Sequence, residues 1–172
     1  MINTHENAIG NRTLVLAKRL AVVLAIVLAV ALAGCTVSKP SSFVDATVES
    51  GNVVIPKASI GSQATFINYD AGGTTVQLLA VQSTNGEPRV ALNTCQSCNP
   101  SPKAYFEQDG DTLTCRNCGL QFSIDTVGVR GASACNPAPI EGLVETDEAF
   151  FVPTATLDAY APYFKQWEGP TR

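Results

Sequence analysis

Residues 95–118 read CQSCNPSPKAYFEQDGDTLTCRNC, and this stretch does most to decide the fold. It begins and ends with a C-x-x-C motif, and sixteen residues separate the two motifs. This spacing is typical of two metal-binding turns, or knuckles, that face each other across a β-hairpin. The two motifs supply four candidate metal ligands, which are Cys95, Cys98, Cys115 and Cys118.

The ligand types available elsewhere in the chain narrow the choice of metal. The only histidine is His5 and the only methionine is Met1, and both precede a predicted processing site. A metal held by the two motifs therefore has no imidazole or thioether ligand. Thiolates select zinc, iron, an iron–sulfur cluster or Cu(I). The spacing alone is compatible with either structural zinc or an iron centre.

The first 34 residues have the pattern of an export signal. Three basic residues precede an apolar run at residues 20–33, whose 14 residues are fewer than the about 20 needed to span a membrane. The run ends in Leu-Ala-Gly-Cys at residues 32–35, which resembles a bacterial lipobox. The resemblance implies cleavage before Cys35 and acylation there, for example with palmitate. It also implies anchoring on the extracytoplasmic side of the cell membrane. An ordinary signal peptide or a short anchor helix is the alternative.

The remaining 138 residues suit one folded domain. We expect a flexible, lipidated tether over 35–50 and a metal domain over 51–168. From Cys35 onward the chain has 8 Lys/Arg and 14 Asp/Glu residues, a net charge of −6. Nucleic-acid binding is disfavoured because no basic footprint exists. The acidity also favours membrane contact through the acyl anchor rather than through charge.

The domain is predicted to be all-β. Hairpin turns are expected at Asp70–Gly73, Asn85–Gly86 and Asp109–Gly110. Residues 53–92 should form a meander, residues 149–152 a final edge strand, and residues 156–160 a short helix in the C-terminal tail. The expected strands are 53–55, 64–69, 74–82, 89–92, 104–106, 112–114, 120–124 and 149–152.

The cysteine count distinguishes a metal site from a disulfide framework. The chain has six cysteines, and lipidation of Cys35 leaves five, an odd number. Four metal ligands plus Cys135 account for this count better than two disulfides plus an orphan, although disulfides are common outside the cytoplasm. Cys135 is a further candidate, either as an additional or replacement ligand, as a redox thiol, as the partner of another cysteine in a disulfide, or as an ordinary buried residue.

Three stretches of the chain resemble the FtrD-like family of membrane iron–sulfur proteins: VALNTC at residues 90–95, GDTLTCRNCGLQF at 110–122 and ACNPAPI at 134–140. The similarity spans about residues 53–140 and is expected to extend to Phe164, so that it covers most of the chain after Cys35. It implies a cysteine-ligated metal centre outside the membrane, with ligands Cys95, Cys98, Cys115 and Cys118, and Cys135 at the family's fifth cysteine. It further implies electron transfer in iron uptake, beside an iron permease or another membrane redox or transport component.

The arrangement of strands and knuckles is also similar to the cluster-binding half of a Rieske domain. The chain departs from that pattern because Rieske centres use two histidines, and both positions are cysteine here. Four thiolates place more negative charge around the metal and should lower its potential. We therefore expect a small Rieske-like, rubredoxin-like or zinc-ribbon-like β fold without Rieske redox chemistry.

Two further functions compete with that of a lipid-anchored electron carrier. A binding module with a structural zinc site made of four cysteines needs no redox chemistry. Thiol–disulfide exchange would place C-x-x-C at the start of a helix, but no helical pattern follows either motif. Hydrolytic catalysis is disfavoured because no histidine follows residue 5. An electron carrier is favoured over an enzyme in its own right.

Overall fold

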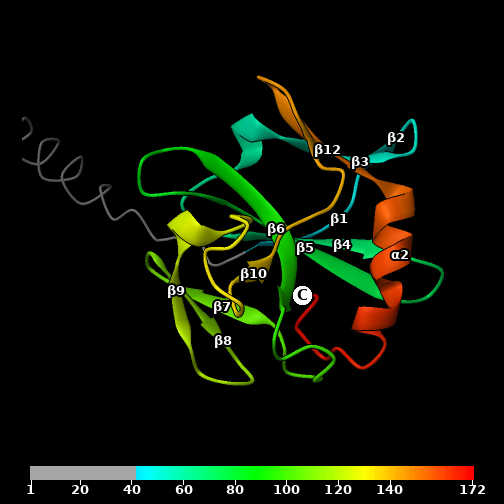
Figure 1. Ribbon diagram of the computed structural model, residues 1–172. Coiled ribbons are helices and arrows are strands. Elements are labelled where there is room, and N and C mark those ends of the chain that lie inside the picture. Colours follow the sequence, from blue (N-terminus) through cyan, green and yellow to red (C-terminus); the bar gives the residue numbers. More distant parts are fainter. Residues whose placement is uncertain (1–41) are drawn as a thin grey trace, which may run out of the picture. The chain divides into compact units, whose positions relative to one another are not determined.

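A computed structural model describes residues 42–172, which fold into three β-sheets and one α-helix (Figure 1). The central sheet has the order β1-β4-β5-β6-β10. Strand β1 is parallel to β4, and the other neighbours are antiparallel. Its strands are β1 Ser42–Asp45, β4 Thr65–Asp70, β5 Thr75–Gln82, β6 Pro88–Cys95 and β10 Pro137–Ala138.

The other two sheets are antiparallel and smaller. One has the order β11-β12-β3-β2 and the other the order β7-β8-β9. Two short 3-10 turns, η1 Lys57–Ser59 and η2 Ile124–Thr126, and the helix α2 Thr154–Phe164 complete the fold. The strands are β2 Val48–Glu49, β3 Asn52–Pro56, β7 Phe106–Asp109, β8 Thr112–Cys115, β9 Gln121–Ser123, β11 Val144–Glu145 and β12 Ala149–Pro153.

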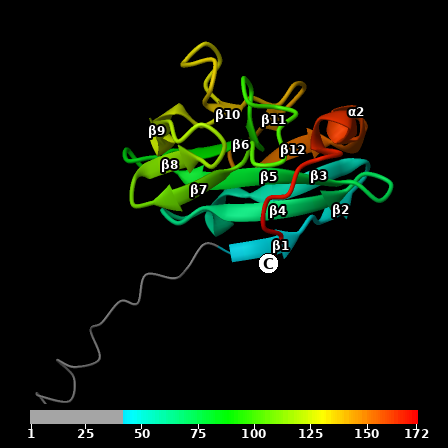
Figure 2. The ribbon, with the colours of Figure 1, turned by 90° about the horizontal axis from the view of Figure 1, so that it is seen from below.

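Strand β5 is the middle of the molecule, because its side chains are buried on both faces. Val76 and Leu78 pack in a cluster with residues of β3, β12 and α2. Leu79 and Val81 face the opposite way and pack with Phe106 of the small sheet and with residues near the knuckles. The central sheet therefore separates two cores, and the second of them contains Cys95 and Cys115. Figure 2 shows the small sheet β7-β8-β9 and the helix α2 toward opposite ends of the central sheet.

Most of the predicted β pattern is confirmed. Strands β4, β5 and β6 form the expected meander, with turns at Asp70–Gly73 and around Gly86. Three details differ. The strand at 53–55 leaves the meander and pairs with β12 in another sheet. For that reason β12 is also no edge strand, since it lies between β3 and β11. The C-terminal helix is longer than predicted and contains Pro162.

The structure includes part of the predicted tether. Strands β1 and β2 lie within residues 42–49, and β1 extends the central sheet beside β4. The predicted signal segment 1–34 and the lipidation site Cys35 lie outside the described residues. Within residues 42–172, no helix has the length and apolar character needed to cross a membrane.

Candidate metal centre

Each C-x-x-C motif begins at the last residue of a strand. Cys95 ends β6 and Cys115 ends β8. The two turns close alike: the Asn99 N–H donates to the carbonyl of Cys95 at 3.0 Å, and the Gly119 N–H donates to that of Cys115 at 2.9 Å. Gly119 has a φ of 74°, which glycine adopts without a side-chain clash. The sequence therefore builds two equivalent turns on two strand ends.

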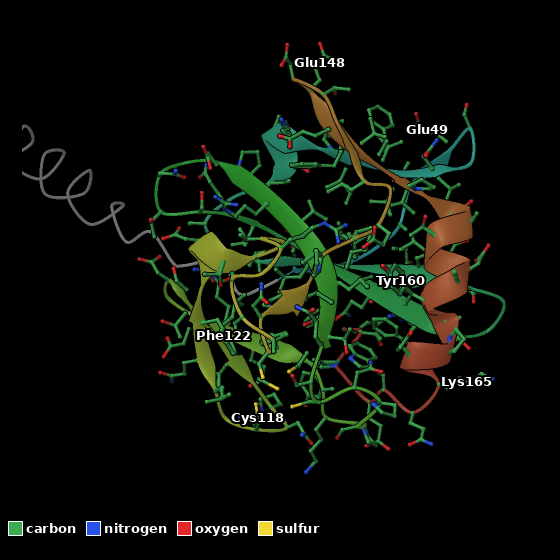
Figure 3. All side chains as sticks on the ribbon, in the orientation of Figure 1. Glu49, Cys118, Phe122, Glu148, Tyr160 and Lys165 are labelled. Atoms are coloured by element: carbon green, nitrogen blue, oxygen red, sulfur yellow. The ribbon has the colours of Figure 1, made fainter. Side chains whose placement is uncertain are left out.

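The two turns bring four sulfur atoms together. All lie within 4.8 Å of one another, and Cys98 Sγ is 3.9 Å from Cys115 Sγ. Figure 3 shows sulfur atoms gathered near Cys118, where the small sheet meets the first knuckle. Cys95 and Cys115 are fully buried, Cys98 is half-buried and Cys118 is exposed. The site therefore has a buried side and one side open to solvent.

Metal binding at these thiols requires the release of protons. Burial raises the pKa of Cys95 and of Cys115, although backbone N–H groups of the knuckles donate to both sulfurs. Partial burial also acts to raise the pKa of Cys98, but hydrogen bonds to its sulfur, led by one from the Asn117 side chain, outweigh burial and lower its pKa. A metal must displace protons from the two buried thiols, so metal affinity should increase with pH.

Cys135 is not one of the four convergent cysteines. It is half-buried and packs in the same apolar cluster as Cys98. Its loop rests on the first knuckle, because Ser97 Oγ donates to the carbonyl of Ala134 at 2.7 Å and Gln96 Nε2 donates to Asn136 Oδ1 at 3.1 Å. All five cysteines of the described residues are free thiols. The role of Cys135 stays a prediction.

A buried amide pair holds the two halves of the site in register. Asn93 is 1% exposed and Gln77 is fully buried. Asn93 Oδ1 accepts from the Phe106 N–H at 2.9 Å, and Asn93 Nδ2 donates to Gln77 Oε1 at 2.6 Å. Because Asn93 precedes Cys95 by two residues and Phe106 pairs with Cys115, this contact links the two cysteine-bearing strands.

The C-terminal tail covers the same amide pair. Gln77 Nε2 donates to the carbonyl of Pro170 at 2.8 Å, and Trp167 Nε1 donates to the carbonyl of Asn93 at 3.2 Å. Sequence reasoning missed Asn93 and Gln77, because their partners are far away along the chain. Only their polar character within otherwise apolar strands marks them as unusual.

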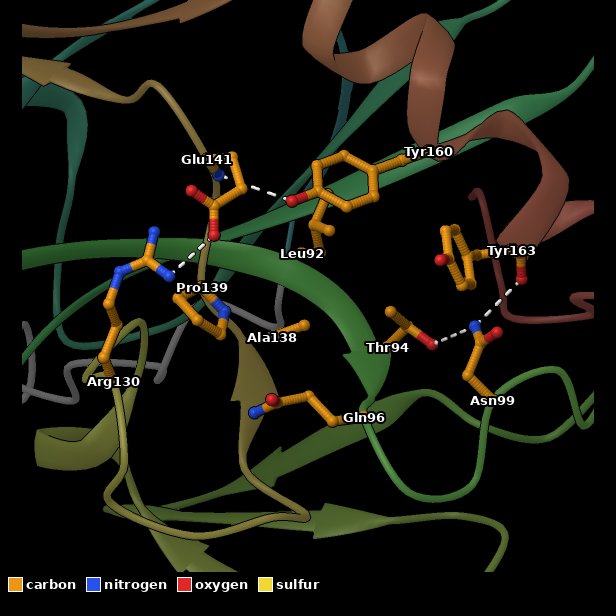
Figure 4. A pocket seen from close by; sticks show the side chains of 10 residues that line it. All are labelled: Leu92, Thr94, Gln96, Asn99, Arg130, Ala138, Pro139, Glu141, Tyr160 and Tyr163. Atoms are coloured by element: carbon orange, nitrogen blue, oxygen red, sulfur yellow. Dashed lines mark hydrogen bonds and ion pairs between the residues drawn. The ribbon is translucent and has the colours of Figure 1, made fainter.

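A pocket of about 330 Å³ opens beside the first knuckle (Figure 4). An ion pair of 2.6 Å between Arg130 and Glu141 lies in its lining, and Asn99 Nδ2 bridges Thr94 Oγ1 and the carbonyl of Tyr163. Its charged groups are therefore already paired with each other. The lining residues are Leu92, Thr94, Gln96, Asn99, Arg130, Ala138, Pro139, Glu141, Tyr160 and Tyr163.

The four cysteines fit a tetrahedral metal site. Metal–sulfur bonds of about 2.3 Å at tetrahedral angles place sulfurs about 3.8 Å apart. The observed spacing of 3.9 Å between Cys98 and Cys115 agrees with that value, and 4.8 Å is the upper limit for the set. All-sulfur donors suit zinc, iron and iron–sulfur clusters. The chemistry of the donor set and its geometry thus both support a metal-binding role.

Comparison with known proteins assigns the chain to a family. No curated protein and no solved structure matches it. The family model described as membrane iron-sulfur containing protein FtrD-like matches residues 60–164, which is more than half of the chain and includes both knuckles and Cys135. Together with the convergent thiols, this match shows that the chain belongs to the FtrD-like family of membrane iron–sulfur containing proteins.

Proposed function

We propose that the four knuckle cysteines hold a single iron ion and that the protein carries one electron at a time for a membrane partner. The observation that carries the proposal is the sulfur group within 4.8 Å, in a chain of an iron–sulfur family. In a cluster, two or more irons with bridging sulfide lie between the cysteine sulfurs. The sulfurs would have to lie farther apart than around one ion, so the observed spacing favours one ion.

The residues around the sulfurs suit electron transfer better than substrate chemistry. When bound, iron in a four-thiolate site supplies a centre that gains and loses one electron. Four protein ligands leave no open position for a substrate. The buried Cys95 and Cys115 keep water from one side, and the exposed Cys118 gives a partner access from the other. We therefore place electron exchange at the Cys118 side.

The local architecture supports a likeness to Rieske-like or zinc-ribbon-like knuckles. One C-x-x-C turn follows β6 and the other lies between β8 and β9 of the small sheet. The remaining structure is larger, because two further sheets and a helix surround this unit. We propose the likeness for the knuckle unit only.

Location and partners complete the proposal. A lipid on Cys35 would tether the domain to the extracytoplasmic face of the cell membrane, next to an iron permease or a membrane reductase. Two observations support this location. Residues 32–35 resemble a lipobox, and the description of the matching family names a membrane protein. Residues 36–41 would then connect the lipid to β1.

Reductive titration tests the redox role. We expect protein purified without added metal from its own host to absorb visible light and to bleach on uptake of one electron per chain. Air or a mild oxidant should restore the absorbance. Colourless protein with one zinc per chain and no titratable electron would contradict electron transfer and support a structural zinc site.

A further inference from the structure

The residue that follows the second cysteine differs between the two knuckles. In the second knuckle it is Gly119, which has no side chain and closes the turn on Cys115 through its backbone N–H. In the first knuckle it is Asn99, whose backbone N–H closes the turn on Cys95 in the same way. The side chain of Asn99 adds contacts that a glycine cannot make, so the two knuckles are held differently.

The side-chain amide of Asn99 makes two hydrogen bonds (Figure 4). Its Nδ2 group donates one proton to Thr94 Oγ1 and the other to the carbonyl of Tyr163, each at 2.9 Å. An amide nitrogen has two protons, so both donors are used. Thr94 directly precedes Cys95, and Asn99 directly follows Cys98. The bond to Thr94 therefore encloses both cysteines of the first knuckle.

The second hydrogen bond joins the first knuckle to the C-terminal helix. Tyr163 lies in the last turn of α2, where backbone carbonyls have no partner within the helix, and Asn99 supplies a donor there. The chain after α2 makes a further contact, because the Glu168 N–H donates to the carbonyl of Pro102 at 2.8 Å. Residues 96–105, which connect β6 to β7, are thus attached to the C-terminal segment at two points.

We propose that Asn99 is a positioning residue, which holds Cys98 in place as a metal ligand by joining the first knuckle to the end of α2. Cys95 is fixed by its place in β6, whereas Cys98 lies outside the strands and depends on the contacts of its loop. A ligand that is already ordered costs less conformational entropy on binding. The inference rests on the site of four cysteines and not on electron transfer.

The experiment compares the zinc affinity of Asn99→Ala and Asn52→Ala with that of the wild-type full chain, by competition with a chromophoric chelator. Asn52 is the matched control, because its Nδ2 donates to the carbonyl of Ser50 at 3.1 Å and its strand belongs to the sheet without a knuckle. Loss of a residue that orients a ligand typically weakens metal binding about 10- to 100-fold. We expect about a tenfold loss for Asn99→Ala and a change under about twofold for Asn52→Ala.

Two further measurements separate positioning from a merely structural role. At saturating cobalt, Asn99→Ala should show the same sulfur-to-cobalt charge-transfer absorption as wild type, because all four ligands remain. Cys98→Ser, which lacks one thiolate, should absorb less. Urea denaturation of the metal-free protein measures stability alone. A lower stability of Asn99→Ala with an unchanged zinc affinity would overturn the inference, since Asn99 would then only stabilise the end of α2.

Thr94→Val gives a second test that keeps Asn99 and its bond to Tyr163. It removes one hydrogen bond, so we expect about a threefold loss of zinc affinity. If circular dichroism shows that Asn99→Ala does not fold, this variant decides, and an affinity equal to that of Asn52→Ala would overturn the inference. If the protein from its own host holds only zinc, electron transfer fails, yet the zinc affinities still decide the role of Asn99.

Discussion

Cys115→Ser should lose its metal and much of its stability. Cys115 is fully buried at the end of β8, and its sulfur is one of the four that converge. With serine at this position the site keeps three thiolate ligands, and the serine hydroxyl is a poor fourth ligand. Metal that binds only the folded state adds about 4 kcal/mol when its free concentration is about a thousand times the Kd, and the variant forfeits this contribution. Metal analysis after dialysis measures the loss of metal, and urea denaturation measures the loss of stability. Both are compared with wild type.

Cys135→Ser is the matched control for this prediction. Cys135 packs against the same buried cluster as Cys98 but lies outside the four-sulfur group. We expect the variant to keep its metal and to lose no more than about 1 kcal/mol, as a change at a half-buried site outside the ligand set. Metal loss in Cys135→Ser together with retention in Cys115→Ser would show that the ligand set is wrong.

Asn93→Leu should destabilise the fold by about 3 to 5 kcal/mol. The substitution leaves the buried Phe106 N–H and Gln77 Oε1 without their partner, and each unsatisfied buried group costs about 1–3 kcal/mol. The link between the two cysteine-bearing strands is lost at the same time. The zinc-loaded protein should therefore release its metal at a lower urea concentration than wild type does.

A double-mutant cycle separates this hydrogen bond from a general packing effect. Gln77→Leu alone also breaks hydrogen bonds to Asn68 and to the carbonyl of Pro170. In the double variant both members of the Gln77–Asn93 bond are apolar, so the total loss should be smaller than the sum of the single losses. Strict additivity, or a loss below about 1 kcal/mol for Asn93→Leu, would contradict the role assigned to the amide pair.

Local sequence patterns predicted the elements well and their partners less well. The turn residues at Asp70–Gly73 and Gly86 identified the β4-β5-β6 meander because hairpin chemistry is local. The position of β12 was missed because its neighbour β3 lies far earlier in the chain. Strand β11 consists of only Val144 and Glu145, which is too short to show an alternating pattern of apolar residues.

The four sulfurs could be predicted because their chemistry is repeated at a recognisable spacing. The supporting residues could not. Asn93 acts through hydrogen bonds to Phe106 and Gln77, which lie more than ten positions away, and such contacts leave no periodic pattern in the sequence. The Cys135 loop is an intermediate case, since the cysteine itself was singled out but the contacts of Ser97 and Gln96 were not.

Iron K-edge X-ray absorption on protein purified from its own host distinguishes a single iron ion bound by four cysteines from every other occupant of the site. We expect one iron per chain with four sulfur neighbours at about 2.3 Å, no acid-labile sulfide and no second iron in the outer shell. A clear iron–iron distance with stoichiometric sulfide would show that the four cysteines hold a cluster and not a single ion. Oxygen or nitrogen neighbours would show that the thiols are not the complete ligand set.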